Sequence, residues 1–170
     1  MILRVQALMP DSNSDYNSLL RPGRCSHMGQ SDMDDQELAR LLQEMQTMAR
    51  DLVQQAGGCP PFGGTIDDGG QVGLIFDQTA VSGGAGAEAA KRVLETVRHA
   101  AQAANIRAAA VGGMAYVTDP ETNLRTTATV ISLHHRTGRN VDYVTPFSKA
   151  ASGAIYFGKP ITGLSKTKLF

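Results

Sequence analysis

The chain has 170 residues, 42% of them hydrophobic and 5% aromatic, and its 16 basic residues balance its 16 acidic residues. This length is sufficient for one domain whose core needs neither a disulfide nor a metal. A neutral chain without a basic tract argues against nucleic acid as a partner. The sequence shows no secretory signal and no apolar segment of membrane-spanning length, so we expect a cytoplasmic protein that does not enter a membrane.

The first part of the chain predicts an arm followed by a long helix. Residues 1–30 follow neither a helical nor a strand period, which predicts an irregular or disordered N-terminal arm. A helix is predicted to begin at Ser31 or one residue later and to end at Gly57-Gly58, because apolar residues recur between them at helical spacing. Its stripe carries Met45 and Met48. Core packing is the simpler interpretation of these methionines, and they become an interface if the helix packs on a second subunit.

The middle of the chain predicts a hairpin and a second helix. Two strand-like runs within residues 62–76 flank Asp67-Asp68-Gly69-Gly70, and an Asp-Gly pair fits a type I′ turn. A second helix is predicted from Ala87 to about Ala104, with a mostly alanine face that should pack closely.

The last part of the chain predicts strands separated by turn residues at hairpin spacing. The strands are expected at Ile106–Val117 with a bulge at Gly112-Gly113, at Arg125–His135, at Val141–Phe147 and briefly at 154–157. Residues 161–170 are basic and predict a mobile C-terminal tail. Residues 31–160 are therefore expected to form a single α+β domain, in which an antiparallel sheet of about five strands packs with two main helices.

Clustered histidines occur at the end of one predicted strand. His134 and His135 are adjacent, and successive strand side chains point to opposite faces, so the pair cannot share one ion and no metal site is predicted. A two-residue Gly138-Arg139 loop would place His135 opposite Asp142, whose carboxylate could orient the imidazole as a general base. A three-residue loop would instead place Arg136 opposite Asp142 as an ordinary ion pair. The first register makes His135 and Asp142 candidate catalytic residues, although no nucleophile shares their face.

A glycine-rich segment precedes the second predicted helix. Its backbone at Ser82, Gly83, Gly84 and Gly86 could offer amide donors to an anion or nucleotide. The segment lacks Gly-Lys-Ser/Thr, and Ala89 stands where the dinucleotide motif has its third glycine, so a flexible connector is the main interpretation.

The two cysteines show no pattern that predicts a cofactor. Cys25 and Cys59 are too far apart for Cys-x-x-Cys and lack the spacing of a zinc site, which predicts two free thiols. No cofactor is expected.

Two resemblances support the same fold class. Residues 62–157 resemble a group of small bacterial proteins of unknown function, through Asn105-Ile106-Arg107-Ala108, His134-His135-Arg136, Val141-Asp142-Tyr143-Val144, Pro146-Phe147 and Tyr156-Phe157-Gly158. The chain departs from that pattern at His134, where the group has Glu, and at Phe147, where it has Tyr, which weakens any site built on those groups. The order of elements resembles roadblock and profilin-like proteins, which implies pairing with another copy.

The leading functional hypothesis is a non-enzymatic protein-interaction or dimerisation module, with itself or another protein as the partner. A small hydrolase or ligand-binding enzyme at His135 and Asp142 is one alternative. Anion or nucleotide binding at Gly83–Gly86 is the other.

Overall fold

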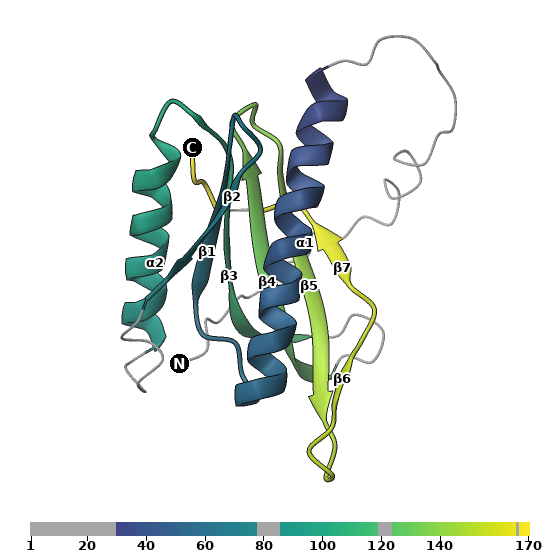
Figure 1. The fold of residues 1–170 in the computed structure, drawn as a ribbon. Helices are drawn as coiled ribbons and strands as arrows, with labels where there is room; N and C mark the ends of the chain where they lie inside the picture. The colour runs from purple at the N-terminus through teal and green to yellow at the C-terminus, as the bar shows by residue number, and fades with distance from the viewer. Residues whose placement is uncertain (1–29, 78–85, 119–123, 166) are drawn as a thin grey trace, which may run out of the picture.

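The computed structural model describes residues 30–77, 86–118, 124–165 and 167–170, which form two helices and one antiparallel sheet (Figure 1). The predicted α+β class is confirmed, with seven strands in the sheet instead of about five. The predicted arm lies outside the described residues, apart from Gln30, which begins the first helix. The elements are α1 (Gln30–Ala56), β1 (Phe62–Asp67), β2 (Val72–Phe76), α2 (Gly86–Ala101), β3 (Ile106–Thr118), β4 (Arg125–His135), β5 (Asn140–Lys149), β6 (Ile155–Phe157) and β7 (Ile161–Gly163).

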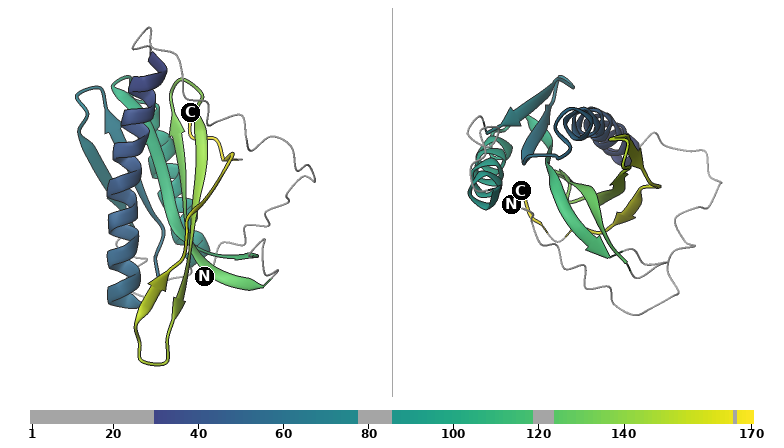
Figure 2. Two further views of the ribbon diagram at one scale, coloured as in Figure 1. Left: turned by 90° about the vertical axis from the view of Figure 1, so that its right-hand side faces the viewer. Right: turned by 90° about the horizontal axis from the view of Figure 1, so that it is seen from below.

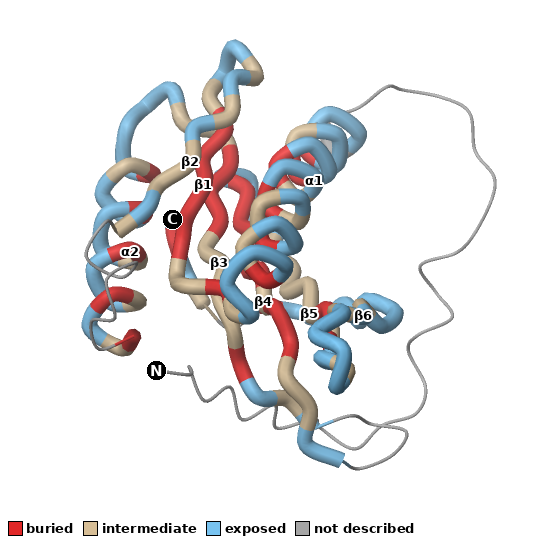
Figure 3. Tube along the Cα trace, turned by 60° about the horizontal axis from the view of Figure 1, so that its bottom comes forward, coloured by how far each residue is buried: buried red, intermediate tan, exposed pale blue. Residues whose placement is uncertain are grey.

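The sheet has the strand order β2-β1-β3-β4-β5-β6, and β7 also pairs with β5. The sheet curls around α1, and α2 packs on the opposite, outer face (Figure 2). We call the side that holds α1 the inner face. Buried residues concentrate on β1, β3, β4 and the sheet-facing sides of the helices (Figure 3). The core is therefore divided into two layers by the central strands.

The inner layer is built on the stripe of α1. Buried residues recur every three or four positions along the helix, which is the spacing of one helical face: Leu38, Leu41, Met45, Ala49 and Val53. They pack against Phe62, Ile66, Ala108, Ala110, Ile131 and Leu133 of the sheet.

The methionine interface predicted on α1 is wrong for Met45. This side chain is fully buried in the inner layer, and Met48 packs against the edge of the same layer. The sheet of the same chain covers this face of α1, so Met45 cannot contact a second subunit.

Glycines in two strands allow α1 to approach the sheet closely. A Cβ atom on Gly64 would lie 2.8 Å from the Met45 sulfur, and one on Gly112 would lie 2.7 Å from the Phe62 ring. The bulge predicted at Gly112-Gly113 does not occur, because the β3–β4 register is continuous there. Gly112 makes room for an aromatic ring instead of interrupting the strand.

The outer layer is smaller and includes the end of the chain. Val93, Val97 and Ala101 of α2 pack against Ala109 of β3 and against Leu169. Residues 161–163, predicted as part of a mobile tail, instead form β7, and the Arg98 guanidinium donates to the Lys168 carbonyl at 3.2 Å. The C-terminal residues are thus part of the packed structure.

The packing of Leu169 predicts a clear stability difference between two leucines of this segment. Leu169 is 5% exposed and Leu164 is 85% exposed. We expect Leu169→Ala to lower the free energy of unfolding by about 2–3 kcal/mol, because it leaves a cavity beside α2. Leu164→Ala should change it by less than about 0.5 kcal/mol. Urea denaturation followed by circular dichroism measures both, and equal values would contradict the packing role of the segment.

Candidate functional site

The β4–β5 turn has a different register from either of the two predicted from the sequence. The His135 amide donates to the Arg139 carbonyl at 2.8 Å, and the Gly138 amide donates to the His135 carbonyl at 2.9 Å. Arg136, Thr137 and Gly138 therefore form a three-residue loop. Gly138 takes the last loop position with φ 94°, where a residue without Cβ is favoured. The prediction had placed this glycine first in a two-residue loop.

This register separates the predicted catalytic pair. Asp142 lies opposite Ser132, not opposite His135 or Arg136. Because side chains alternate along a strand, His135 points to the inner face whereas Asp142 belongs to the outer face. The predicted His135–Asp142 site does not form.

The structure instead surrounds His135 with polar groups from α1 and from its own turn. His135 Nε2 lies 2.8 Å from Glu37 Oε2, and His135 Nδ1 lies 2.8 Å from Thr137 Oγ1. The Thr137 hydroxyl donates to Asp34 Oδ2 at 2.7 Å. The His135 side chain is fully buried and that of Asp34 is 4% exposed. We call Asp34, Glu37, His135 and Thr137 the helix–turn cluster.

The sequence contained one signal for this cluster that the prediction did not use. Asp34 lies four residues before Leu38, so it continues the buried stripe of α1, and Glu37 lies one turn away from it on a neighbouring face. Acidic residues in the first turns of a helix suit the helix dipole. A carboxylate within a buried stripe also requires a hydrogen-bond or charge partner, which points to a polar group on the facing sheet.

Arginines extend the contacts around the turn. Arg139 pairs with Asp35 of α1 at 2.6 Å, and Arg107 of β3 lies 3.7 Å from Glu37 Oε2. The Arg136 guanidinium donates to the carbonyls of Ala101 and Ala104 at 3.0 and 3.1 Å. It thereby binds carbonyl groups at the C-terminal end of α2, where cations are favourable. The turn thus connects to both helices.

A second polar group lies on the outer face. Ser165 Oγ lies 3.4 Å from His134 Nε2, and Asp142 Oδ1 is a buried oxygen with no hydrogen-bond partner among the described residues. Burial lowers the pKa of His134, and the nearby Asp142 charge partly opposes that change. A serine, a histidine and an aspartate therefore lie near one another, but Ser165 and His134 are both buried and neither lines the groove described next.

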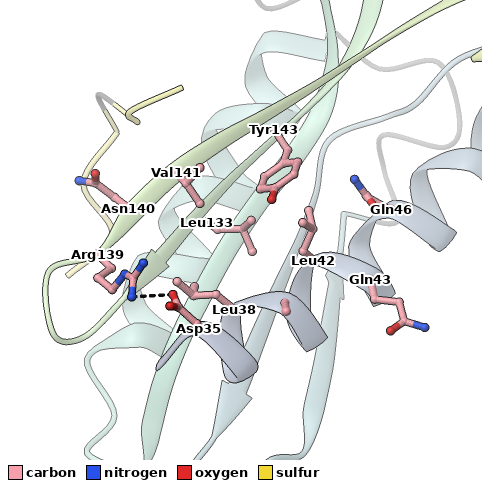
Figure 4. Close-up of a pocket in the computed structure, with 11 residues that line it drawn as sticks. Asp35, Leu38, Leu42, Gln43, Gln46, Leu133, Arg139, Asn140, Val141 and Tyr143 are labelled. Atoms are coloured by element: carbon pink, nitrogen blue, oxygen red, sulfur yellow. Dashed lines mark ion pairs between the residues drawn. The ribbon is translucent and has the colours of Figure 1, made fainter. Parts of the chain in front are cut away.

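A groove of 340 Å³ runs between α1 and the sheet beside the helix–turn cluster (Figure 4). One wall is the side of α1 formed by Asp35, Leu38, Ala39, Leu42, Gln43 and Gln46. The other is formed by Leu133, Arg139, Asn140, Val141 and Tyr143, and Figure 4 shows Leu38 and Leu42 facing the side chains of the strands. The groove is apolar at its base and carries amide, hydroxyl and charged groups at its margins, and its volume lies in the range of ligand sites.

The remaining predicted site residues are placed as follows. Ser82, Gly83 and Gly84 lie outside the described residues, and Gly86 is the buried first residue of α2. Cys59 is a free thiol, and its burial raises its pKa to about 12, which keeps it in the unreactive thiol form. Cys25 lies outside the described residues. Neither described helix has a stretch long and apolar enough to cross a bilayer.

Comparison of the chain with protein family models, with curated proteins and with solved structures finds no match. The groove and the helix–turn cluster therefore carry the functional interpretation on their own chemistry.

Proposed function

We propose that this chain is a non-enzymatic protein-interaction module that binds a short extended segment of a partner protein in the groove between α1 and β5. The observation that carries the proposal is the shape and lining of that groove. Its helical wall runs from Asp35 to Gln46, which at 1.5 Å per residue is about 16 Å. An extended peptide of about five residues has this length.

The chemistry of the lining suits a peptide. Leu38, Leu42 and Val141 offer an apolar surface for one or two partner side chains. Gln43, Gln46 and Asn140 are side-chain amides, which can both donate to and accept from the main chain of an extended peptide. The partner segment is accordingly expected to be uncharged and to carry a branched or aromatic anchor residue.

The lining gives less support to catalysis. Its ionisable side chains are Asp35, Arg139 and Tyr143, and the first two are paired with each other at 2.6 Å. General acid–base or nucleophilic catalysis requires a base and a nucleophile within hydrogen-bond reach of one bound substrate. His135 does not line the groove, and Asp142 belongs to the outer face of the sheet. Anion or nucleotide binding at Gly83–Gly86 stays a prediction from the sequence.

A peptide selection tests the proposal. We expect a library of random heptapeptides displayed on phage to yield sequences that bind the wild-type chain with a micromolar Kd in fluorescence polarisation. Ala39 is an exposed residue that lines the groove. Ala39→Trp should weaken peptide binding at least tenfold, because the bulky indole would occupy the space that the peptide needs. Ala56→Trp is the matched control, since Ala56 is an exposed alanine of α1 outside the lining, and it should bind as the wild type does.

Failure to select any peptide, or equal binding by Ala39→Trp, would contradict the proposal. Light scattering at the concentrations used for binding shows whether a second copy of the chain supplies the segment. A strict monomer restricts the partner to another protein.

A further inference from the structure

We propose that Asp34, Glu37 and His135 form a binding site for a divalent metal ion of the zinc class. Each of these residues offers one ligand atom, and the three atoms lie within 4.8 Å of one another. Two ligands come from the first turns of α1 and the third from the end of β4. The site does not rest on the proposed function, because none of the three side chains lines the groove.

The burial of the two carboxylates is the first argument. The Asp34 side chain is 4% exposed and that of Glu37 is 16% exposed, and the two converge on the same imidazole. Buried carboxylates in proteins are paired with cations or coordinate metals, because an isolated buried charge loses its hydration. Arg107 reaches Glu37 Oε2 at 3.7 Å, a long distance for a charge-assisted hydrogen bond. A dication would bind both carboxylates directly.

The chemical identity of the ligand atoms indicates which metal ion the site would bind. One imidazole nitrogen with two carboxylate oxygens is a donor set that zinc and its first-row neighbours accept, whereas calcium and magnesium prefer oxygen ligands alone. Three protein ligands are also the number found where zinc keeps a fourth position for water or substrate. The Thr137 hydroxyl lies 2.8 Å from His135 Nδ1, so it would orient the imidazole through the ring nitrogen that does not bind the ion.

The candidate ligand atoms must move closer together to hold the ion. Zinc with bonds of about 2.1 Å in a tetrahedron holds its ligand atoms about 3.4 Å apart. With a single ring nitrogen of His135 counted, the three candidate ligand atoms lie within 4.8 Å of one another, so they must approach by up to about 1.4 Å to reach that spacing. His135 Nε2 is already 2.8 Å from Glu37 Oε2, whereas the 3.6 Å contact of Asp34 Oδ2 is to the other ring nitrogen, Nδ1, so Asp34 makes the larger movement. The ion would replace the proton in the His135–Glu37 hydrogen bond, and that proton would pass to solvent.

Access does not require opening the core. The Glu37 side chain keeps 16% of its surface exposed and Thr137 is exposed in the turn, so the site lies just below the surface at one end of the sheet. The supporting elements are a helix and a strand, which hold the ligands in place without the ion.

Zinc titration of the full chain after EDTA treatment tests the site. We expect isothermal titration calorimetry to show one zinc ion bound with a micromolar Kd, and a rise in Tm that follows from preferential binding to the folded state. His135→Gln and Glu37→Gln should each weaken binding at least tenfold. His134→Gln is the matched control, because His134 is the adjacent histidine on the outer face, and it should bind zinc as the wild type does.

Two results would overturn the site. One is the absence of saturable zinc binding to the wild-type chain. The other is equal binding by the folded His135→Gln and Glu37→Gln variants, which would locate the ion at other residues. Circular dichroism establishes that each variant is folded, and Glu37→Gln preserves the shape of the side chain if His135→Gln does not fold. Magnesium at the same concentration should leave the Tm unchanged, and the peptide selection in the groove is unaffected by either outcome.

Discussion

Replacing His135 with alanine in metal-free buffer should lower the free energy of unfolding by about 3–5 kcal/mol. The imidazole contacts Glu37 at 2.8 Å and Thr137 at 2.8 Å, and its side chain is fully buried. Its loss leaves the Glu37 and Asp34 carboxylates beside an empty space and removes one of their partners. Urea denaturation at neutral pH measures the change.

A double-mutant cycle separates the interaction from the loss of volume. Glu37→Gln alone, His135→Ala alone and the two together should give a coupling energy of at least about 1 kcal/mol, because the residues share a hydrogen bond. His134→Ala is the control for removing a buried imidazole from the same strand, and its cost should be smaller than that of His135→Ala. A cost for His135→Ala no larger than that for His134→Ala would contradict the role given to the helix–turn cluster.

Gly63→Ala should be the second strongly destabilising change, with a loss of about 3 kcal/mol in the free energy of unfolding. Gly63 lies in β1, and a Cβ at this position would overlap the Val97 Cγ2 methyl of α2. The added methyl requires the Val97 side chain to rotate or α2 to move away from the sheet. Differential scanning calorimetry or urea denaturation measures the loss.

A compensating substitution tests this explanation. Val97→Ala removes the overlapping methyl, so Gly63→Ala with Val97→Ala should be more stable than the sum of the two single losses predicts, by about 1 kcal/mol or more. Gly163→Ala is the control, since a Cβ there meets nothing within 4 Å, and it should stay within about 0.5 kcal/mol of the wild type. Additive losses would show that close packing against α2 is not the cause.

Local patterns in the sequence were sufficient to predict the main elements. The stripe of α1, its end at Gly57 with φ 70°, and the strands Arg125–His135 and Ile106–Thr118 follow from helical spacing, turn residues and β-branched content. Each of these signals lies within one element. They were sufficient for the α+β class, whereas the face of the sheet on which each helix packs was not predicted.

The candidate sites depend on contacts between residues that are far apart in the sequence. Local sequence patterns do not predict such contacts. Glu37 and His135 are 98 positions apart, and their contact depends on how the sheet curls around α1. The register of the β4–β5 turn was predicted wrongly because Gly138 was assigned to the first position of the loop instead of the last. A shift of one residue in strand register moves a side chain's partner to the other face of the sheet. Leu169 was missed because a single leucine in a polar segment has no periodicity.

The helix–turn cluster has a consequence for how the chain folds. The helix α1 precedes the β4–β5 hairpin in the chain, and its Asp34 and Glu37 meet their partners only when Thr137 and His135 arrive, 103 and 98 residues later. Closing such a long loop requires ordering most of the chain first, and contacts of high sequence separation slow folding. The N-terminal end of α1 should therefore remain hydrated, and the helix only partly docked, until the β4–β5 hairpin has formed.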